Sequence, residues 1–134
     1  MNPLPKRVCV IDDDEAVRDS MRVLLESYGV AVEVFSSARE FLPHSCDSAD
    51  CMLLDLHMPE MDGLQLLNAI REQGSSRPVI VITGRGDDQL SARARLAGAY
   101  TLLSKPVEDE VLLRSITCAV AASAAKIIAE NVVF

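Results

Sequence analysis

The sequence lacks a long hydrophobic run, a cluster of basic residues, an internal repeat and an obvious linker. No stretch approaches the ~20 apolar residues that a membrane-spanning helix needs, so we expect no membrane contact. Residues 1–7 contain two prolines and no apolar run after their positive charges, which argues against a secretory signal and predicts a cytoplasmic location. The net charge is −7 without a basic patch, and we therefore expect no direct binding to nucleic acid.

The cysteines do not form a metal-binding pattern. The spacings between Cys9, Cys46, Cys51 and Cys118 match no zinc motif, and the implied cytosol keeps thiols reduced. We therefore predict that these four side chains serve in packing.

Length and composition favour one compact domain. A chain of 134 residues can bury about two-thirds of its unfolded surface, and 49% hydrophobic with 25% charged residues is typical of a folded α/β protein. We predict a single domain over residues 1–134, with a core at about 6–122 and a helical C-terminal extension at 123–134. This extension is either a solvated tail or a contact surface leading toward another module, and both interpretations stay open.

Hydrophobic periodicity alternates between strand and helix along the whole chain. β-branched apolar runs predict strands, and apolar residues at helical spacing predict helices that end near glycine or proline. The expected strands are 7–11, 31–35, 51–54, 78–82 and 100–103, and the expected helices are 17–28, 36–42, 63–73, 88–97 and 107–131. This alternation predicts a doubly wound α/β fold, in which a five-stranded parallel sheet is covered on both faces.

Polar groups suited to phosphoryl chemistry follow four of the five expected strands. They are Asp12 and Asp13 after the first strand, Asp55 after the third, Thr83 and Gly84 after the fourth, and Ser104, Lys105 and Pro106 after the fifth. Ligands bind outside the carboxyl ends of the strands in such sheets, so we expect these groups at one site. Two carboxylates ~4 Å apart repel by about 4 kcal/mol at an effective dielectric of about 20, so the three aspartates need a cation. Mg²⁺ suits their oxygen atoms.

The motifs are specific as a set, in this order and at these separations. The acidic pair Asp12-Asp13, the segment 55–63 (DLHMPEMDG), Thr83 after an apolar strand, and Lys105-Pro106 resemble a response-regulator receiver domain over nearly the whole chain. Segments 78–87 and 108–112 look most like the FixJ-like subgroup, in which a receiver commonly precedes a LuxR-type helix-turn-helix domain. The resemblance implies the flavodoxin-like (CheY-like) (βα)5 fold with strand order 2-1-3-4-5.

The resemblance also implies a role for each of these residues. Asp55 would be the phosphoacceptor, which attacks the phosphorus of a phosphohistidine or of a small phosphodonor. Asp13 and Asp55 would bind Mg²⁺ directly, Asp12 would act largely through water, and His57 would contribute its backbone carbonyl. Thr83 and Lys105 are suited to contact phosphoryl oxygens, with Gly84 beside them and Pro106 after a cis peptide that aims the lysine inward.

One position departs from the family pattern. Receivers usually carry an aromatic switch residue three positions before the lysine, where this sequence has Leu102. Tyr100 lies on the same face of the expected strand and could replace the aromatic residue only in part. The side chains of His57 and Arg85 flank the expected site and are candidates for tuning the phosphate lifetime. We expect phosphorylation to draw Thr83 inward and to reshape the surface of the fourth helix, fifth strand and fifth helix, with a smaller rearrangement at Leu102.

These features predict a phosphorylation-controlled signalling module, which catalyses only its own phosphorylation and dephosphorylation. Its expected partners are a sensor histidine kinase or phosphotransfer protein and a downstream effector or output domain. A phosphorylation-dependent homodimer through the fourth helix, fifth strand and fifth helix is a further expectation. An aspartate-nucleophile phosphatase is a different interpretation, but such enzymes typically carry a second carboxylate two residues after the nucleophile, where this chain has His57. A receiver-fold interaction module with weak or no phosphorylation-dependent switching is the remaining alternative.

Overall fold

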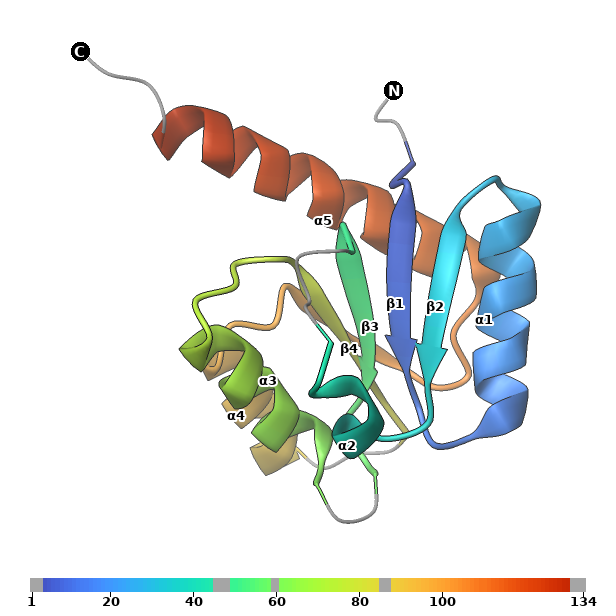
Figure 1. Ribbon diagram of the computed structural model, residues 1–134, viewed down its shortest axis with the longest axis horizontal. Coiled ribbons are helices and arrows are strands. Elements are labelled where there is room, and N and C mark those ends of the chain that lie inside the picture. The colour runs from blue at the N-terminus through green and yellow to red at the C-terminus, as the bar shows by residue number, and fades with distance from the viewer. Residues whose placement is uncertain (1–3, 45–48, 59–60, 85–87, 131–134) are drawn as a thin grey trace.

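The computed structural model describes residues 4–44, 49–58, 61–84 and 88–130, with side chains described up to residue 126. Within these ranges five parallel strands form one sheet in the order β2-β1-β3-β4-β5 (Figure 1). The strands are β1 (Arg7–Ile11), β2 (Ala31–Phe35), β3 (Cys51–Asp55), β4 (Val79–Thr83) and β5 (Thr101–Ser104). This order and the alternation of strands with helices confirm the predicted doubly wound fold.

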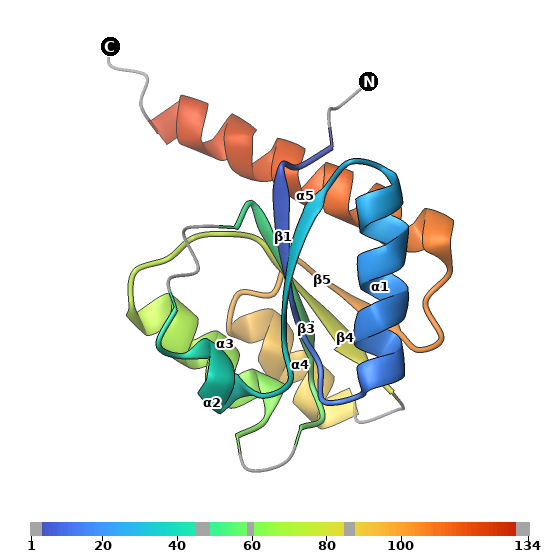
Figure 2. The same ribbon diagram turned by 45° about the vertical axis from the view of Figure 1, so that its right-hand side comes forward.

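Helices cover both faces of the sheet. α1 (Glu15–Ser27) and α5 (Asp109–Glu130) lie on one face, and α2 (Ala38–Phe41), α3 (Gly63–Glu72) and α4 (Asp88–Leu96) lie on the other (Figures 1 and 2). Successive side chains of a strand point to opposite faces, so each central strand contributes to two cores. In β3, Met52 and Leu54 pack with the α2, α3 and α4 side, whereas Cys51 and Leu53 pack with the α1 and α5 side.

The central strands are apolar on both faces because both faces are covered. Every residue of β3 and β4 is buried, as their continuous apolar runs require. β5 is an edge strand, whose residues are half-buried except for the exposed Ser104. Asp55 and Thr83, the last residues of the two central strands, are therefore held at the margin of the core.

The pairing register brings the strand ends into line. Ile11 of β1 pairs with Leu54 of β3, so Asp12 and Asp55 are the next residues at the same edge of the sheet. β4 and β5 also end in register, which brings Lys105 to this edge. The expected site residues thus converge at the carboxyl ends of the strands.

Several element boundaries differ by a residue or two from the expectation. α2 is shorter than expected because Ser37 has an extended conformation and serves as its N-cap. β5 begins at Thr101 because the pairing with β4 starts opposite Ile80. α5 begins at Asp109 rather than at residue 107, since Glu108 is the acceptor of the hydrogen bond that opens the helix.

The packing prediction holds for two cysteines and fails for one. Cys9 and Cys51 are buried in the two cores, but Cys118 on α5 is exposed, so the prediction is wrong there. Cys118 lies two positions after the buried Ile116, and at 3.6 residues per turn this places it on the opposite side of the helix. Cys46 lies outside the described residues.

α5 is much longer than the strands that it covers. Its 22 residues correspond to about 33 Å of helix, whereas a five-residue strand spans about 17 Å. Among the side chains described at 109–126, the buried ones are Leu112, Ile116 and Ala119, and those at 120–126 are half-buried or exposed. The second half of the helix therefore extends beyond the sheet (Figure 1). Over the described ranges, the structure contains no helix with the length and apolar character needed to cross a membrane.

Candidate functional site

Three carboxylates meet at the carboxyl edge of the sheet. Asp12, Asp13 and Asp55 each offer an oxygen, and these oxygens lie within 4.8 Å of one another. Asp12 and Asp55 are almost fully buried, with 1% and 3% of their surface exposed, whereas Asp13 is exposed. Buried carboxylates at this spacing repel one another, so the arrangement is suited to hold a cation.

Lys105 supplies a positive charge to this cluster from the end of β5. Its Nζ lies 3.1 Å from Asp12 Oδ2 and 3.5 Å from Asp55 Oδ1. The Lys105–Pro106 peptide bond is cis, as the resemblance implied, and the Lys105 N–H donates to the Thr83 carbonyl at 2.8 Å. Burial lowers the pKa of Lys105, but hydrogen bonds and charge from Asp12 and Asp55 outweigh burial and raise the pKa above its usual value. The lysine thus stays charged beside two buried carboxylates.

The Asp55 carboxyl is harder to ionise than an ordinary aspartate. Burial, followed by the negative charge of Asp12, raises its pKa from 3.8 to about 6. Lys105 and the His57 N–H, which donates to Asp55 Oδ1 at 3.3 Å, act in the opposite direction but do not compensate. One lysine is therefore too little positive charge for three carboxylates, and a hard cation that prefers oxygen ligands fits this donor set.

The raised pKa of Asp55 predicts a pH dependence of stability in the metal-free protein. The pKa is 3.8 in the unfolded chain and about 6 in the folded one, so the folded state binds the proton more tightly. The contribution of Asp55 to the free energy of unfolding is fully present below the unfolded-state pKa of 3.8, and it is lost as the pH rises through about 6. We expect the free energy of unfolding in urea with EDTA to fall, relative to that of Asp55→Asn, between about pH 4 and pH 7. A difference that stays constant over this range would contradict the perturbed carboxyl.

The acidic residues after β1 have two different roles. Asp14 is the N-cap of α1, and its carboxylate accepts the N–H groups of Ala16 and Val17. Asp12 belongs to the site, and its Oδ1 accepts the Asp14 N–H at 2.9 Å. The Asp12 N–H donates to the Phe35 carbonyl at 3.1 Å, which ties this loop to the end of β2.

Arg18 makes a contact at this loop that the sequence patterns did not point to. Its Nη1 donates to the Asp12 carbonyl at 2.7 Å. A cation near the first turns of a helix is unfavourable toward the helix dipole, which prefers negative charge there. That unusual placement is the signal in the sequence that could have drawn attention to Arg18.

Thr83 borders the site on the β4 side. The residue is buried, and its Oγ1 lies 3.5 Å from the His57 Nε2. Gly84 follows and is half-buried, and nothing lies within 4 Å of the position that a Cβ would occupy. The structure thus brings Thr83 and the His57 side chain together beside Asp55, with open space at Gly84. Arg85 lies outside the described residues.

A close backbone approach positions the loop that follows Asp55. Gly63 begins α3, and its N–H donates to the Leu56 carbonyl at 3.0 Å. A Cβ on Gly63 would lie 2.3 Å from the Asp55 carbonyl oxygen and 2.8 Å from the Leu56 Cα. Asp62 is the N-cap of α3 and forms a capping box with Gln65. The start of α3 is therefore pressed against the backbone of Asp55.

Leu102 and Tyr100 lie in different environments. Leu102 is half-buried and packs against the core on the α3 and α4 side, which includes Ala94. Tyr100 precedes β5 and is 44% exposed, and it lines a hollow with Pro78 and Ala119 at the amino end of the strands. The structure does not bring Tyr100 to the acidic cluster, so leucine alone occupies the position of the usual aromatic residue.

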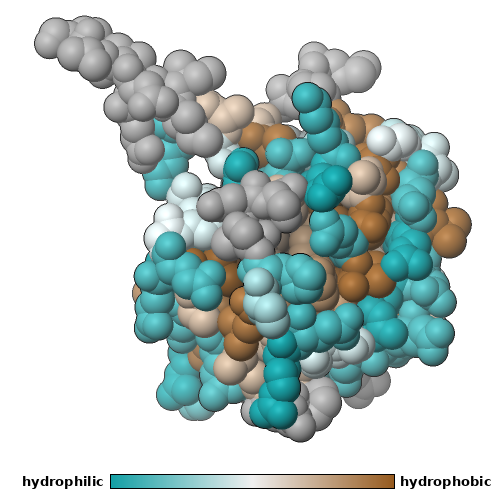
Figure 3. All heavy atoms as spheres, in the orientation of Figure 1, coloured by the Kyte–Doolittle hydropathy of each residue, from teal (hydrophilic) through white to brown (hydrophobic). Residues whose placement is uncertain are grey.

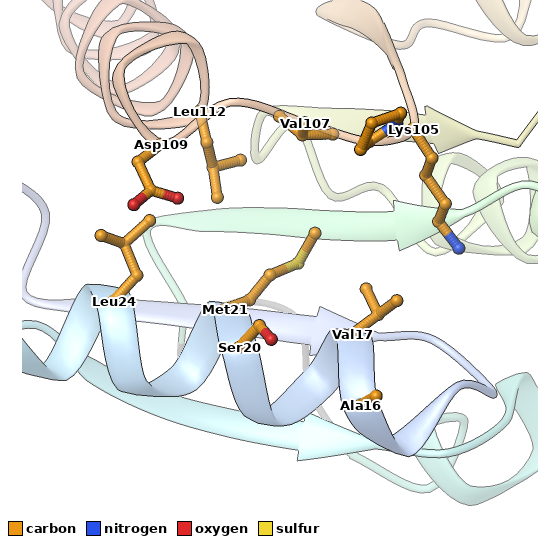
Figure 4. A pocket seen from close by; sticks show the side chains of 10 residues that line it. Ala16, Val17, Ser20, Met21, Leu24, Lys105, Val107, Asp109 and Leu112 are labelled. Carbon is orange, nitrogen blue, oxygen red and sulfur yellow. The ribbon is translucent and has the colours of Figure 1, made fainter.

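A groove of about 430 Å³ runs between α1 and the segment that joins β5 to α5 (Figure 4). Its apolar lining comes from Val17, Met21 and Leu24 on one side and from Val107 and Leu112 on the other. Lys105 lies at one end of the groove, with its ammonium directed to the aspartates. Hydrophobic side chains also reach the surface on the α1 side of the molecule in Figure 3. On this helix Val23 is 67% exposed. An apolar surface thus leads up to the acidic cluster.

The chain is similar to known proteins along most of its length. Residues 8–117 match a family model described as response regulator receiver domain. The response regulator protein TodT of Pseudomonas putida is 41% identical over 113 residues, which cover 84% of this chain and 50% of TodT. The transcriptional regulatory protein FixJ of Bradyrhizobium diazoefficiens is 41% identical over 114 residues, which cover 84% of this chain and 56% of FixJ. The chain spans about half the length of the curated relatives that it matches.

The architecture is also similar to that of solved structures. The structure of a response regulator receiver domain protein (CheY-like) from Methanospirillum hungatei superposes with a TM-score of 0.85 at 30% sequence identity. The superposition covers 90% of this chain and 98% of that protein. This match confirms the expected CheY-like fold with strand order 2-1-3-4-5.

Proposed function

The chain belongs to the response regulator receiver domain family, and on this basis we propose that Asp55 receives a phosphoryl group from a phosphohistidine. A receiver domain is a signalling phosphoacceptor of two-component systems rather than a classical enzyme. The observation that carries the assignment to Asp55 is its position, buried at the end of β3 beside two further carboxylates and Lys105. A carboxylate held in this way can act as a nucleophile toward phosphorus.

The proposed transfer depends on positioning and on neutralisation of charge. An Asp55 oxygen forms the new P–O bond while the P–N bond to the donor imidazole breaks. The phosphohistidine reacts with its other ring nitrogen protonated, so the bond electrons return to the imidazole and it leaves neutral. The transition state spreads charge over the phosphoryl oxygens. Lys105 is placed to contact one of these oxygens, and the Thr83 hydroxyl can donate to another after leaving His57. The open space at Gly84 supports entry of the phosphoryl group from that side.

We propose Mg²⁺ as the cation of this site. Asp13 and Asp55 would bind it directly, Asp12 largely through water, and His57 through its backbone carbonyl. When bound, the ion would neutralise part of the charge on the carboxylates and on the phosphoryl oxygens. The exposure of Asp13 supports this assignment, because it leaves one side of the cluster open to water and to the incoming group.

The proposed partners follow from the family and from the length of the relatives. A sensor histidine kinase or a phosphotransfer protein would supply the phosphoryl group in the cytoplasm. TodT and FixJ are about twice as long as the matched region, and we propose that this domain likewise controls an output domain or effector. No direct contact with nucleic acid or membrane is part of this proposal. A phosphorylation-dependent homodimer would use α4, β5 and α5, where Leu96 is 89% exposed.

Acetyl phosphate tests the proposed function directly. The protein is incubated with acetyl phosphate and either Mg²⁺ or EDTA, and its intact mass is measured. We expect an adduct of one phosphoryl group with Mg²⁺ and none with EDTA, because the three carboxylates need a cation. If Mg²⁺ binds and no adduct forms, the chain is an interaction module of receiver fold instead.

Binding of beryllofluoride with Mg²⁺ is expected to change the surface of α4, β5 and α5. The phosphoryl analogue would draw the Thr83 hydroxyl away from His57, and Leu102 would repack against the α4 side of the core. Amide NMR spectra with and without the analogue measure this change residue by residue. Shifts confined to the loops around Asp55 and Thr83 would contradict transmission to that surface and favour the module without switching.

A further inference from the structure

Arg18 reaches from α1 back to the loop that carries the acidic pair. Its Nη1 donates to the Asp12 carbonyl at 2.7 Å, a contact that spans six residues. This carbonyl belongs to the peptide unit that joins Asp12 to Asp13. Hydrogen bonds from a charged donor are stronger than neutral ones, so the Arg18 contact restricts rotation of this peptide plane.

The orientation of this peptide plane decides where Asp13 points. Asp12 is held from other directions, because its N–H donates to the Phe35 carbonyl and its carboxylate binds Lys105. Asp13 is exposed and lies at the far side of the peptide that Arg18 contacts. Rotation of the peptide would therefore turn the Asp13 carboxylate relative to that of Asp12.

The positive charge of Arg18 also acts on a carboxylate beyond the end of β2. Hydrogen bonds from Ser36, with a smaller contribution from the positive charge of Arg18, lower the pKa of Glu40. Glu40 lies in α2 and accepts the Ser36 N–H at 3.0 Å, which links this helix to the residue after β2. The Asp12 carbonyl is thus the hydrogen-bond partner of Arg18, and Glu40 feels only the charge of its guanidinium.

We propose that Arg18 is a positioning residue for the metal site, because it orients the Asp12–Asp13 peptide so that Asp13 and Asp55 face the same cation. This inference rests on the proposed function, in which these carboxylates hold Mg²⁺. Electrostatics alone predicts the opposite effect, since removing a positive charge near an acidic cluster tightens the binding of a cation. The sign of the change in affinity therefore separates positioning from simple charge.

Titration with MgCl₂ followed by amide NMR tests the role of Arg18. We expect Arg18→Gln to weaken Mg²⁺ binding about tenfold, in the range for lost partners of metal ligands. Arg18→Lys keeps a charged donor and is expected to lose no more than about threefold. The matched control is Arg22→Gln, which removes the same charge one turn further along α1 and is expected to leave the affinity unchanged or slightly higher. In the metal-free spectra, only the Arg18 variants are expected to shift the amide signals of Asp13 and Asp14.

Each outcome of this titration has a definite meaning. An Mg²⁺ affinity of Arg18→Gln equal to or above that of the parent protein would overturn the role of Arg18 alone. A parent protein that binds no Mg²⁺ at the acidic cluster would overturn the proposed function and this inference with it. If Arg18→Gln does not fold, Arg18→Met carries the same expectation, because methionine keeps the apolar stem and has no N–H donor for the Asp12 carbonyl.

Discussion

The Asp55→Asn variant is expected to gain no phosphoryl group from acetyl phosphate and Mg²⁺ under conditions in which the parent protein gains one. An asparagine amide fills nearly the same space at the end of β3 but is not a nucleophile toward phosphorus. Intact mass measures the adduct. Asp13→Asn is the matched control, because it removes a carboxylate from the same cluster and keeps the nucleophile. We expect slower incorporation in that variant rather than none.

The Asp55→Asn substitution should also stabilise the metal-free protein against unfolding. The rise in the pKa of Asp55 to about 6 means that the ionised carboxylate is unfavourable in the fold. Near pH 7 a shift of this size corresponds to a stabilisation of Asp55→Asn by at most about 3 kcal/mol, measured by urea unfolding with EDTA. If Asp55→Asn were labelled as readily as the parent protein, another carboxylate of the cluster would be the acceptor.

The Gly63→Ala variant is expected to lose about 2–3 kcal/mol of folding free energy. The new Cβ would lie 2.3 Å from the Asp55 carbonyl oxygen and 2.8 Å from the Leu56 Cα. Both neighbours are backbone atoms, so no side-chain rotation relieves the overlap. Urea unfolding measures the loss. Gly84→Ala serves as the control for stability, because its Cβ meets nothing within 4 Å and should change the free energy by less than about 0.5 kcal/mol.

Gly63→Ala should also slow phosphorylation, because the overlap displaces the backbone that carries the nucleophile. A misplacement of about 1 Å can slow a positioned reaction by up to about 100-fold. We expect the rate of phosphorylation by acetyl phosphate to fall at least about tenfold. The rate is followed by intact mass over time. A variant with the stability and the rate of the parent protein would show that α3 can move away without disturbing Asp55.

The sheet and the acidic cluster could be predicted from the sequence for one physical reason. A strand buried on both faces must be apolar throughout, so polar residues stand out where the strand leaves the core. Asp55 after its apolar run and Thr83 after the next are such residues. Because parallel strands end at a common edge, residues far apart in the chain could be assigned to one site. The contact of Lys105 with Asp12 and Asp55 agrees with that assignment.

Contacts that depend on backbone acceptors or on helix orientation could not be predicted in this way. The place of Arg18 near the start of a helix is unusual, but its acceptor is a carbonyl group, which every residue carries, so the sequence could not identify its partner. Tyr100 matches the period-two pattern of Leu102, but it precedes the strand and lies at the other end of the sheet. Cys118 lies on the exposed side of α5. The hydrophobic periodicity of this helix is weak because alanines occur on both its buried and its exposed sides, so the sequence did not show which way Cys118 points.

The length of α5 gives small rotations a large effect. The helix begins four residues after Lys105, so movements of this lysine and of the segment after it act close to the first turn. A tilt of about 5° at that turn would displace the far end of a 22-residue helix by about 3 Å. α5 can therefore act as a lever, which converts an angular change beside the acidic cluster into a translation at a distance.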